Sequence, residues 1–301
     1  MTALALALRD SGRWSATIRS YIAITKPRII LLLLATTVPA MVVAEGGWPS
    51  TALVLATLVG GAASAAGANA VNCWYDRDID ALMRRTQSRP LVKGDIPPLN
   101  ALVFGAALGV GAFAFLWATT NLLAAALAGA AFLFYVFIYT VWLKRRSSQN
   151  IVIGGAAGAF PPMVGWAAVT GDLAWGPLIM FAIIFFWTPP HFWALALRIA
   201  PDYREANVPM LPVEAGEVST RRQILAYSIV LVPITLALLL TGTVGWVYGV
   251  VAGVAGLGFV AVAFGLWRWP ERVPSMRLYT YSLAYLAGIF IVMATDVAIL
   301  G

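Results

Sequence analysis

Three oxygen-bearing side chains, Asn72, Asp76 and Asp80, recur every fourth residue at the end of a long apolar stretch. Four-residue steps advance about 400° around an α-helix, so these side chains share one helix face. Two carboxylates on one face repel each other unless a cation lies between them. Oxygen ligands in this number suit Mg²⁺, which takes the rest of its shell from water and substrate phosphates. The spacing predicts a magnesium–diphosphate site, with Asp78 on another face and paired with an arginine.

A basic segment follows this acidic ladder and lies where a bound diphosphate would be. Arginine holds phosphate oxygens with two parallel hydrogen bonds, whereas lysine acts as a point charge. The same charges would also suit an ordinary cytoplasmic loop, so both interpretations stay open here. The predicted diphosphate ligands are Arg77, Arg84, Arg85, Arg89, Lys93 and Arg198.

A second polar segment begins at Asp202 and Tyr203, four predicted membrane spans after the ladder. An even number of spans brings both segments to the same side of the membrane. We therefore expect Asp202 to meet the first site across the helix bundle and to hold metal and diphosphate from the opposite side. The predicted metal ligands are Asn72, Asp76, Asp80 and Asp202.

An aromatic segment contains the only histidine of the chain, His191, directly after Pro189 and Pro190. Two prolines should interrupt or kink the helix and free backbone groups, which only a protein-lined cavity tolerates in a membrane. His191 is expected either to be hydrogen-bonded in this polar kink or to contact a metal-bearing substrate. Aromatic faces stabilise carbocations, and aromatic residues also frequent membrane interfaces. The aromatic candidates for lining a pocket are Trp187, Phe192, Trp193, Trp74 and Tyr75.

The composition assigns these residues to a membrane protein. Of 301 residues, 61% are apolar and 11% are charged, whereas about a quarter of a soluble domain is charged. Apolar runs of about 20 residues, the length that crosses a bilayer, recur along the whole chain. The basic net charge of +7 comes without a long basic run, so we expect no nucleic-acid partner. Cys73, the single cysteine, excludes an intrachain disulfide.

We predict an all-α bundle of nine transmembrane helices around a central cavity. All 20 lysine and arginine residues then fall in the leader or around alternate loops, which places the N-terminus in the cytoplasm and the C-terminus outside. Residues 1–27 are expected to form a cytoplasmic leader, and residues 28–301 a single domain. The predicted spans are 28–47, 50–71, 99–118, 121–142, 150–169, 174–197, 223–243, 246–267 and 279–300.

These motifs resemble a known family. The ladder Asn72-x-x-x-Asp76-x-x-x-Asp80, followed by Arg85-Thr86-x-x-Arg89-Pro90-Leu91, resembles the intramembrane prenyltransferases of the UbiA type. The segments Thr188-Pro189-Pro190-His191-Phe192-Trp193 and Asp202-Tyr203 are similar to those of the branch that farnesylates heme. The resemblance covers about residues 20–300. Three positions depart from the family pattern. Cys73 stands where an acid is frequent, and Asn207 stands where glycine is usual. The second motif of the family is usually a spaced pair of aspartates, whereas here Asp202 has only Glu205 as a candidate partner.

The resemblance implies an enzyme that uses Mg²⁺ to transfer farnesyl from farnesyl diphosphate to a vinyl group of heme b. Water adds to the cation that this transfer forms, and the product is heme O for heme–copper oxidase biogenesis. Heme A synthase or oxidase assembly factors would act downstream, in the cytoplasmic membrane of a bacterium. The implied catalytic residues are Asn72, Asp76, Asp80, Asp202 and Tyr203, and the implied heme-binding residues are His191, Trp187, Phe192 and Trp193.

Other functions fit parts of the pattern. A UbiA-type enzyme acting on an aromatic acid or a quinone precursor would share the acidic ladder, but would not need the segment around His191. A transporter would use intramembrane acids as an ion path, yet the acids here gather at one membrane face. A purely structural subunit would leave both polar segments unexplained.

Overall fold

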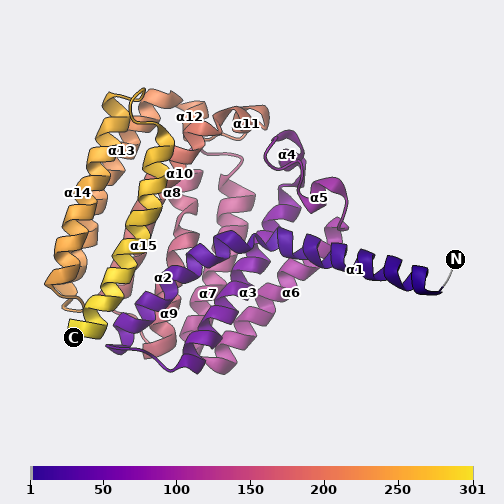
Figure 1. Ribbon diagram of the computed structural model, residues 1–301, viewed down its shortest axis with the longest axis horizontal. Coiled ribbons are helices and arrows are strands. Elements are labelled where there is room, and N and C mark those ends of the chain that lie inside the picture. Colours follow the sequence, from indigo (N-terminus) through magenta and orange to yellow (C-terminus); the bar gives the residue numbers. More distant parts are fainter. Residues whose placement is uncertain (1–2, 301) are drawn as a thin grey trace.

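The computed structural model describes the backbone of residues 3–300 and the side chains of residues 14–298, and this part of the chain is helical without strands (Figure 1). Nine helical segments in it are long and apolar enough to cross a membrane. They are Pro27–Glu45 (α2), Thr51–Tyr75 (α3), Pro98–Thr119 (α6), Leu122–Leu133 with the π-helical Phe134–Leu143 (α7 and η1), Asn150–Gly154 with Ala156–Thr170 (α8 and α9), Trp175–Arg198 (α10), Gly216–Leu236 with the 3₁₀ segment Ala237–Thr241 (α13 and η2), Trp246–Arg268 (α14) and Ser275–Leu300 (α15).

The predicted all-α, nine-span architecture is confirmed, and most span edges agree within a few residues. The largest difference is the seventh span, which begins at Gly216 rather than at residue 223. The apolar run begins only at residue 223, but the helix already starts at Gly216, and Arg221 pairs with Glu217 one turn away in this polar first part. The second span runs on to Tyr75 rather than to residue 71, so Asn72 lies inside it.

Large apolar side chains cover the outside of the bundle. Their exposure would be costly in water, whereas a bilayer solvates them. Together with the nine spans, they establish a multi-pass integral membrane protein. Examples on five different helices are Val110, Trp142, Trp175, Val254 and Ile291.

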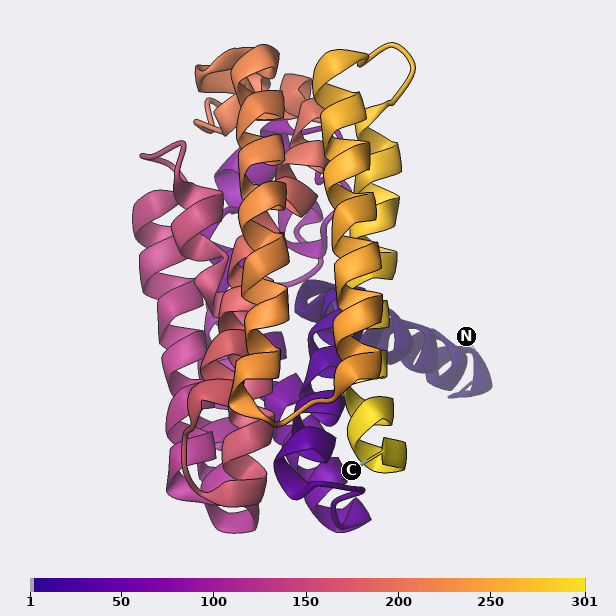
Figure 2. The ribbon, with the colours of Figure 1, turned by 90° about the vertical axis from the view of Figure 1, so that its left-hand side faces the viewer.

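The short helices gather at one end of the bundle, shown at the top of Figures 1 and 2. These helices are α4 (Arg77–Leu82), α5 (Pro90–Lys93), α11 (Ala200–Glu205) and α12 (Leu211–Glu214). The loops that carry basic residues lie at this same end, and the loops at the opposite end carry none. The two polar segments of the sequence therefore meet at one end of the bundle, while the orientation of that end in a membrane stays a prediction.

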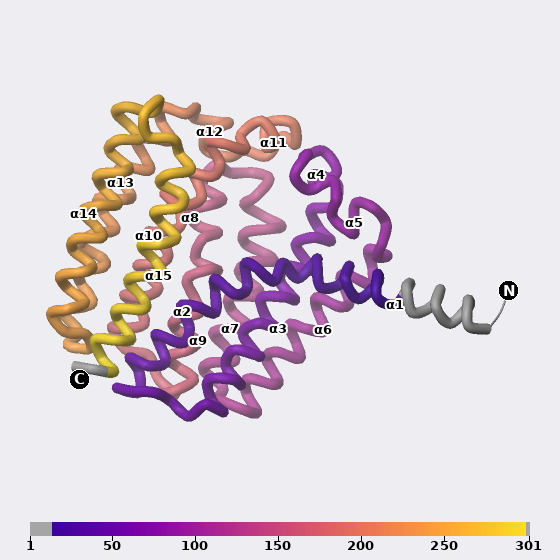
Figure 3. Tube along the Cα trace, viewed as in Figure 1, coloured from indigo at the N-terminus to yellow at the C-terminus, as the bar shows by residue number. Residues whose placement is uncertain are grey.

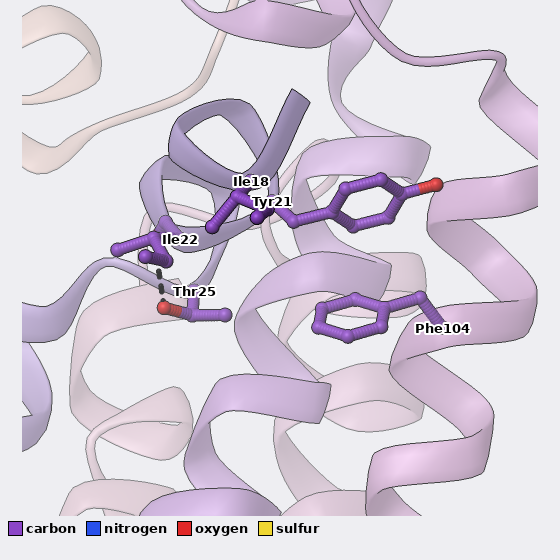
Figure 4. Close-up of a pocket in the computed structure, with 5 residues that line it drawn as sticks. All are labelled: Ile18, Tyr21, Ile22, Thr25 and Phe104. Carbon is purple, nitrogen blue, oxygen red and sulfur yellow. Dashed lines mark hydrogen bonds between the residues drawn. The ribbon is translucent and has the colours of Figure 1, made fainter. Parts of the chain in front are cut away.

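Helix α1 (Ala3–Thr25) approaches the bundle from the side, and its coloured part in Figure 3 crosses α3 and α6. The ring of Tyr21 packs edge-on against Phe104 of α6, with centroids 5.0 Å apart. These rings border an apolar pocket of about 360 Å³ whose other lining residues are Ile18, Ile22 and Thr25 (Figure 4). The packing holds the end of α1 against α3, so that Lys26, the next residue, lies beside the acidic ladder.

Of the break or kink predicted at Pro189 and Pro190, the break is wrong, because α10 is one helix from Trp175 to Arg198, while the kink stays a prediction. Two prolines remove only two backbone donors, and the helical turns on both sides keep theirs. Prolines are tolerated in membrane helices where hydroxyl groups and neighbouring helices satisfy the backbone. Here Thr188 Oγ1 donates to Ile184 O at 2.8 Å, one residue before the carbonyls of Phe185 and Phe186 that the two prolines leave without a helical donor. The indole of Trp187 donates to Ser282 O of α15 at 2.8 Å, which fixes the segment from outside.

Two glycines let α3 and α6 approach until their backbones touch. A Cβ atom on Gly67 would lie 2.6 Å from Gly105 O, which is inside van der Waals contact. Small residues permit this kind of packing between membrane helices. The contact matters for the site, because α3 carries the acidic ladder at its end.

We expect Gly67→Ala to lower the thermal melting temperature of the detergent-solubilised protein, because overpacking costs about 1–3 kcal/mol. Gly111→Ala on α6 is the matched control, since a Cβ there meets nothing within 4 Å. Equal melting temperatures for the two variants would contradict the close contact of α3 and α6.

Candidate active site

The acidic ladder forms a continuous helical face across the junction of α3 and α4. The backbone N–H of Asp76 donates to Asn72 O at 2.9 Å, and that of Asp80 donates to Asp76 O at 2.8 Å. The four-residue repeat therefore continues through the point where α3 ends. The three residues are at most 2% exposed. Their spacing predicted this shared face, and the structure adds that it points into the protein.

Asp76 is the most heavily engaged member of the ladder. Its Oδ2 accepts hydrogen bonds from Lys144 Nζ and, at 2.7 Å, from Asn72 Nδ2. Its Oδ1 lies 3.6 Å from Arg145 Nη2, an ion-pair distance without a hydrogen bond. A carboxylate that is fully buried must be paired in this way to stay charged.

Two further cations contact the other members of the ladder. Arg89 Nη1 donates to Asp80 Oδ2, and Lys26 Nζ donates to Asn72 Oδ1 at 2.8 Å. Burial lowers the pKa of Lys26 to about 8, and the neighbouring cations Arg89 and Lys144 act in the same direction. Four positive groups thus surround two carboxylates, which leaves an excess of positive charge for an anion.

The π-helical segment η1 positions two of these contacts. Thr140 Oγ1 accepts a hydrogen bond from Asn72 Nδ2 at 3.1 Å and donates to Tyr135 O, five residues back, at 2.9 Å. The backbone N–H of Lys144 donates to Tyr139 O, again five residues back, at 2.9 Å. A π-helix rotates side chains relative to an α-helix and is frequent at functional sites. Here it directs Thr140 and Lys144 of one helix toward the ladder of another.

The ladder fits a divalent cation. Asp76 Oδ1 and Asp80 Oδ1 are both buried and have no hydrogen-bond partner in the described part of the chain. A buried carboxylate oxygen without a partner is costly, and a metal ion would remove that cost. No group of three His, Cys, Asp or Glu side chains that could hold a metal occurs among the described residues. The remaining ligands would therefore be the amide of Asn72, water and substrate oxygens, as Mg²⁺ prefers.

Asp78 lies on another face and pairs with an arginine, as predicted. Arg145 donates to both carboxylate oxygens of Asp78, at 2.6 and 2.7 Å, and this hydrogen bonding lowers the pKa of Asp78. The guanidinium also lies 4.7 Å from the ring centroid of Tyr75. Arg145 thus joins Asp76 to the surface at Asp78.

The predicted diphosphate ligands lie at different depths. Arg89 alone among them contacts the ladder in the described part of the chain. Arg77 is exposed and donates to Trp74 O at 2.7 Å, directed away from the buried face. The other four are exposed at the same end of the bundle, namely Arg84, Arg85, Lys93 and Arg198.

The second polar segment lies beside the basic loop of the first. Tyr203 of α11 is 4% exposed. Burial raises the pKa of Tyr203, and the guanidinium groups of Arg85 and Arg89 oppose this rise. Asp202, its neighbour on α11, is half-buried. These two arginines are therefore close enough to Tyr203 to act on it, while the role of Asp202 as a metal ligand stays a prediction.

Asn207 adopts the left-handed backbone conformation that usually favours glycine, with a φ of 50°. Asparagine is among the residues that tolerate this conformation best. The turn closes with a hydrogen bond from the backbone N–H of Val208 to Tyr203 O at 2.9 Å. The departure at Asn207 therefore preserves the turn after α11.

His191 lies between two aromatic rings. Its imidazole stacks on Trp187, with centroids 4.2 Å apart, and on Tyr279 of α15 at 4.6 Å. Its Nδ1 lies 2.6 Å from Ser282 Oγ. The predicted acceptor residues do not all join this cluster, because Trp193 is buried against Tyr227 at 5.4 Å. Phe192 is half-buried.

Sequence reasoning missed several residues of both clusters. In the sequence, Lys26 and Lys144 serve only to predict the membrane topology. The residues Thr140, Tyr279 and Ser282 belong to no recognisable motif. Each reaches its cluster from a distant part of the chain. Only the basic run that begins at Lys144, at the same membrane side as the ladder, offered a signal.

Comparison with known proteins decides the family. A model of the UbiA prenyltransferase family matches residues 33–290, which is most of the chain. The chain belongs to the UbiA prenyltransferase family.

Two similar proteins match nearly the whole length of the chain. A protein of Gloeobacter violaceus named protoheme IX farnesyltransferase is 53% identical over 98% of this chain and 97% of its own. A protein of Mycobacterium avium with the same name is 53% identical over 96% of this chain and 94% of its own.

Solved structures of the UbiA family share the fold. A digeranylgeranylglyceryl phosphate synthase superposes with a TM-score of 0.77 at 16% identity, covering 93% of this chain and 98% of its own. A UbiA homologue of Archaeoglobus fulgidus, described as bound to GPP and Mg²⁺, gives a TM-score of 0.67 at 18% identity, over 90% of this chain and 99% of its own. At these identities the likeness establishes the nine-helix fold alone.

Proposed function

We propose that this UbiA-family prenyltransferase transfers the farnesyl group of farnesyl diphosphate to a vinyl group of heme b, with addition of water, and so forms heme O. The observation that carries the prenyl-transfer chemistry is the pair of buried carboxylates with unpartnered Oδ1 atoms inside a group of cations. The choice of heme as acceptor is supported by the name of the relatives that are 53% identical.

Asn72, Asp76 and Asp80 would hold Mg²⁺ from one side, and Asp202 from the other. The ion, when bound, neutralises negative charge on the departing diphosphate. A metal between the two carboxylates would satisfy the unpartnered oxygens and weaken the hold of the acids on their cations. Lys144 and Arg89 would then be free to turn toward diphosphate oxygens.

The cations of the site would stabilise the leaving group as the bond to farnesyl breaks. Charge accumulates on the diphosphate at this step, so fixed positive groups stabilise the transition state more than the ground state. The buried Lys144 and the half-buried Lys26, Arg89 and Arg145 are placed for this role. The exposed residues Arg77, Arg84, Arg85, Lys93 and Arg198 would attract the anionic substrate to this end of the bundle.

The reaction then proceeds by capture of the allylic farnesyl cation. The vinyl group of heme b forms a carbon–carbon bond to the farnesyl carbon that carried diphosphate. Positive charge moves to the vinyl carbon next to the porphyrin ring, where water adds its oxygen and releases one proton. Asp202 or Tyr203 would position this water, and the apolar interior would keep other water away from the first cation.

His191 would contact the heme, with Trp187 and Phe192 beside it and Trp193 supporting α10 from the core. An imidazole is a common axial ligand of heme iron. A quinone or aromatic-acid acceptor has no metal for His191 to bind, so the cluster around His191 favours heme over that alternative.

We also propose the cellular setting. Residues 1–27 would be a cytoplasmic leader and residues 28–301 a single prenyltransferase domain, with the C-terminus outside. The relatives come from bacteria, which supports the bacterial cytoplasmic membrane. The product would pass to heme A synthase or to oxidase assembly factors.

A direct assay tests this function. Purified protein is incubated with heme b, farnesyl diphosphate and Mg²⁺, and the pigments are separated by chromatography. We expect a new, more apolar heme that requires all three components. His191→Ala is expected to weaken heme binding more than farnesyl diphosphate binding. Prenylation of 4-hydroxybenzoate in place of heme would support the alternative and refute the proposal.

A further inference from the structure

The hydroxyl of Ser282 links His191 to the backbone of α15. Ser282 Oγ donates to Tyr279 O at 2.7 Å and lies 2.6 Å from His191 Nδ1. A serine hydroxyl has one hydrogen, and here that hydrogen is used on the carbonyl of Tyr279. The hydroxyl must therefore accept at its other contact, which means that His191 Nδ1–H is the donor.

This arrangement decides which nitrogen of His191 is available. A neutral imidazole carries one N–H, and placing it on Nδ1 leaves a lone pair on Nε2. No hydrogen bond engages Nε2 among the residues whose side chains are described, and the atom is not among their fully buried polar atoms. Nε2 is therefore the unengaged, electron-donating end of the ring.

The aromatic neighbours fix the plane of the imidazole. The rings of Trp187 and Tyr279 are inclined to it by only 17° and 24°. Two rings this close and this parallel cannot share one face without overlapping, so they cover opposite faces. Trp187 is itself anchored by its indole N–H to Ser282 O at 2.8 Å. The side chain and the backbone of Ser282 thus hold both His191 and the ring stacked on it.

We propose that Ser282 is a positioning residue for the heme acceptor: its hydroxyl holds His191 in the tautomer and orientation that present Nε2 to the heme iron. The inference rests on the proposed function for the identity of the acceptor. Histidines that bind metals usually donate their second N–H to such a partner, which fixes the tautomer and raises the basicity of the ligand. Here Ser282 is that partner, and its own hydroxyl donates to the carbonyl of Tyr279.

The test is a heme titration of the full-length protein in detergent, without farnesyl diphosphate. Ferrous heme b is added to wild type, His191→Ala, Ser282→Ala and Ser282→Thr, and binding is followed by absorption and by the iron–histidine band in resonance Raman spectra. We expect His191→Ala to lose that band. We expect Ser282→Ala to bind heme about 10- to 100-fold more weakly, the usual cost of removing such a partner, and to shift the band. Ser282→Thr keeps the hydroxyl and should therefore keep the wild-type iron–histidine band.

Ser228→Ala is the matched control, because Ser228 is also a buried membrane serine but donates within its own helix, to Ile224 O. The Ser282→Ala variant leaves the backbone carbonyl used by Trp187 in place. Farnesyl diphosphate affinity and melting temperature, measured on the same samples, report correct folding and should stay at the wild-type level. Equal heme affinity and an unchanged band in Ser282→Ala, or equal losses in Ser282→Ala and Ser228→Ala, would overturn the proposal.

The two proposals fail in different ways. A protein that binds heme through His191 in a Ser282-dependent manner but forms no farnesylated heme would refute the proposed function and leave the role of Ser282 intact. A protein that farnesylates heme while Ser282→Ala keeps the wild-type iron–histidine band would refute only the role of Ser282.

Discussion

Replacing Asp76 with asparagine is expected to lower the rate of prenyl transfer by about 1,000-fold or more, because a bound metal ion supplies several kcal/mol of transition-state stabilisation. Asparagine keeps the volume of Asp76 and one oxygen for Asn72 and Lys144, so the fold should persist. It removes one of the negative charges that would hold Mg²⁺ where α3 meets α4. The rate is measured as heme product formed at saturating Mg²⁺.

Glu217→Gln provides the control for this prediction. Glu217 is an acid at the same end of the bundle, exposed and paired with Arg221 on its own helix. Exposed pairs of this kind contribute at most about 1 kcal/mol, so its loss should leave the rate close to wild type. An Asp76→Asn enzyme that keeps more than about a tenth of the wild-type rate would remove Asp76 from the metal site.

Lys144→Met is expected to lower kcat/KM for farnesyl diphosphate by about 100- to 1,000-fold, the usual loss when one fixed donor to a developing charge is removed. Methionine keeps the apolar length of the side chain, while Asp76 retains its contacts with Asn72 and Arg145. Heme affinity, measured by titration, should stay unchanged because His191 belongs to the separate cluster between α10 and α15.

Two further variants sharpen the result for Lys144. Lys144→Arg keeps the charge and should recover part of the lost activity, limited by the different shape of guanidinium. Arg221→Met removes a cation of the same end that contacts Glu217 rather than the ladder, and we expect little change. Equal losses in Lys144→Met and Arg221→Met would show that only the total charge of this end matters.

Much of the fold is predictable because a bilayer leaves few alternatives. Backbone groups in lipid must be satisfied within helices, so apolar runs locate the nine spans. The ladder is equally readable, since its four-residue repeat needs only the geometry of one helix. The all-α class and the placement of Asp78 on another helix face followed from the same local reasoning.

The errors lie where tertiary contacts override local preference. Pro189 and Pro190 predicted a break or a kink, but α10 runs through them as one helix that is packed against α15, where Trp187 donates to Ser282 O. Lys26 adopts a left-handed conformation with a φ of 56°, which is uncommon for lysine. The hydrogen bond from Lys26 to Asn72 holds it there.

The sequence predicts only part of the candidate site for the same reason. Lys144 meets Asp76 across 68 residues of chain, and Ser282 meets His191 across 91 residues. Both pairs depend on helix packing, and the first also depends on the π-helical turn of η1. No periodicity of the sequence predicts either feature. The motifs therefore identified one partner of each contact, and the structure supplies the other.

The central claim is that the metal-bound diphosphate site delivers farnesyl to heme with capture of water. Its most direct test is the mass of the heme product formed by purified protein in isotopically labelled water. We expect a heme b that carries one farnesyl group and one hydroxyl whose oxygen comes from the labelled solvent. A farnesylated heme without labelled oxygen, or unchanged heme b beside a prenylated aromatic acid, would contradict it.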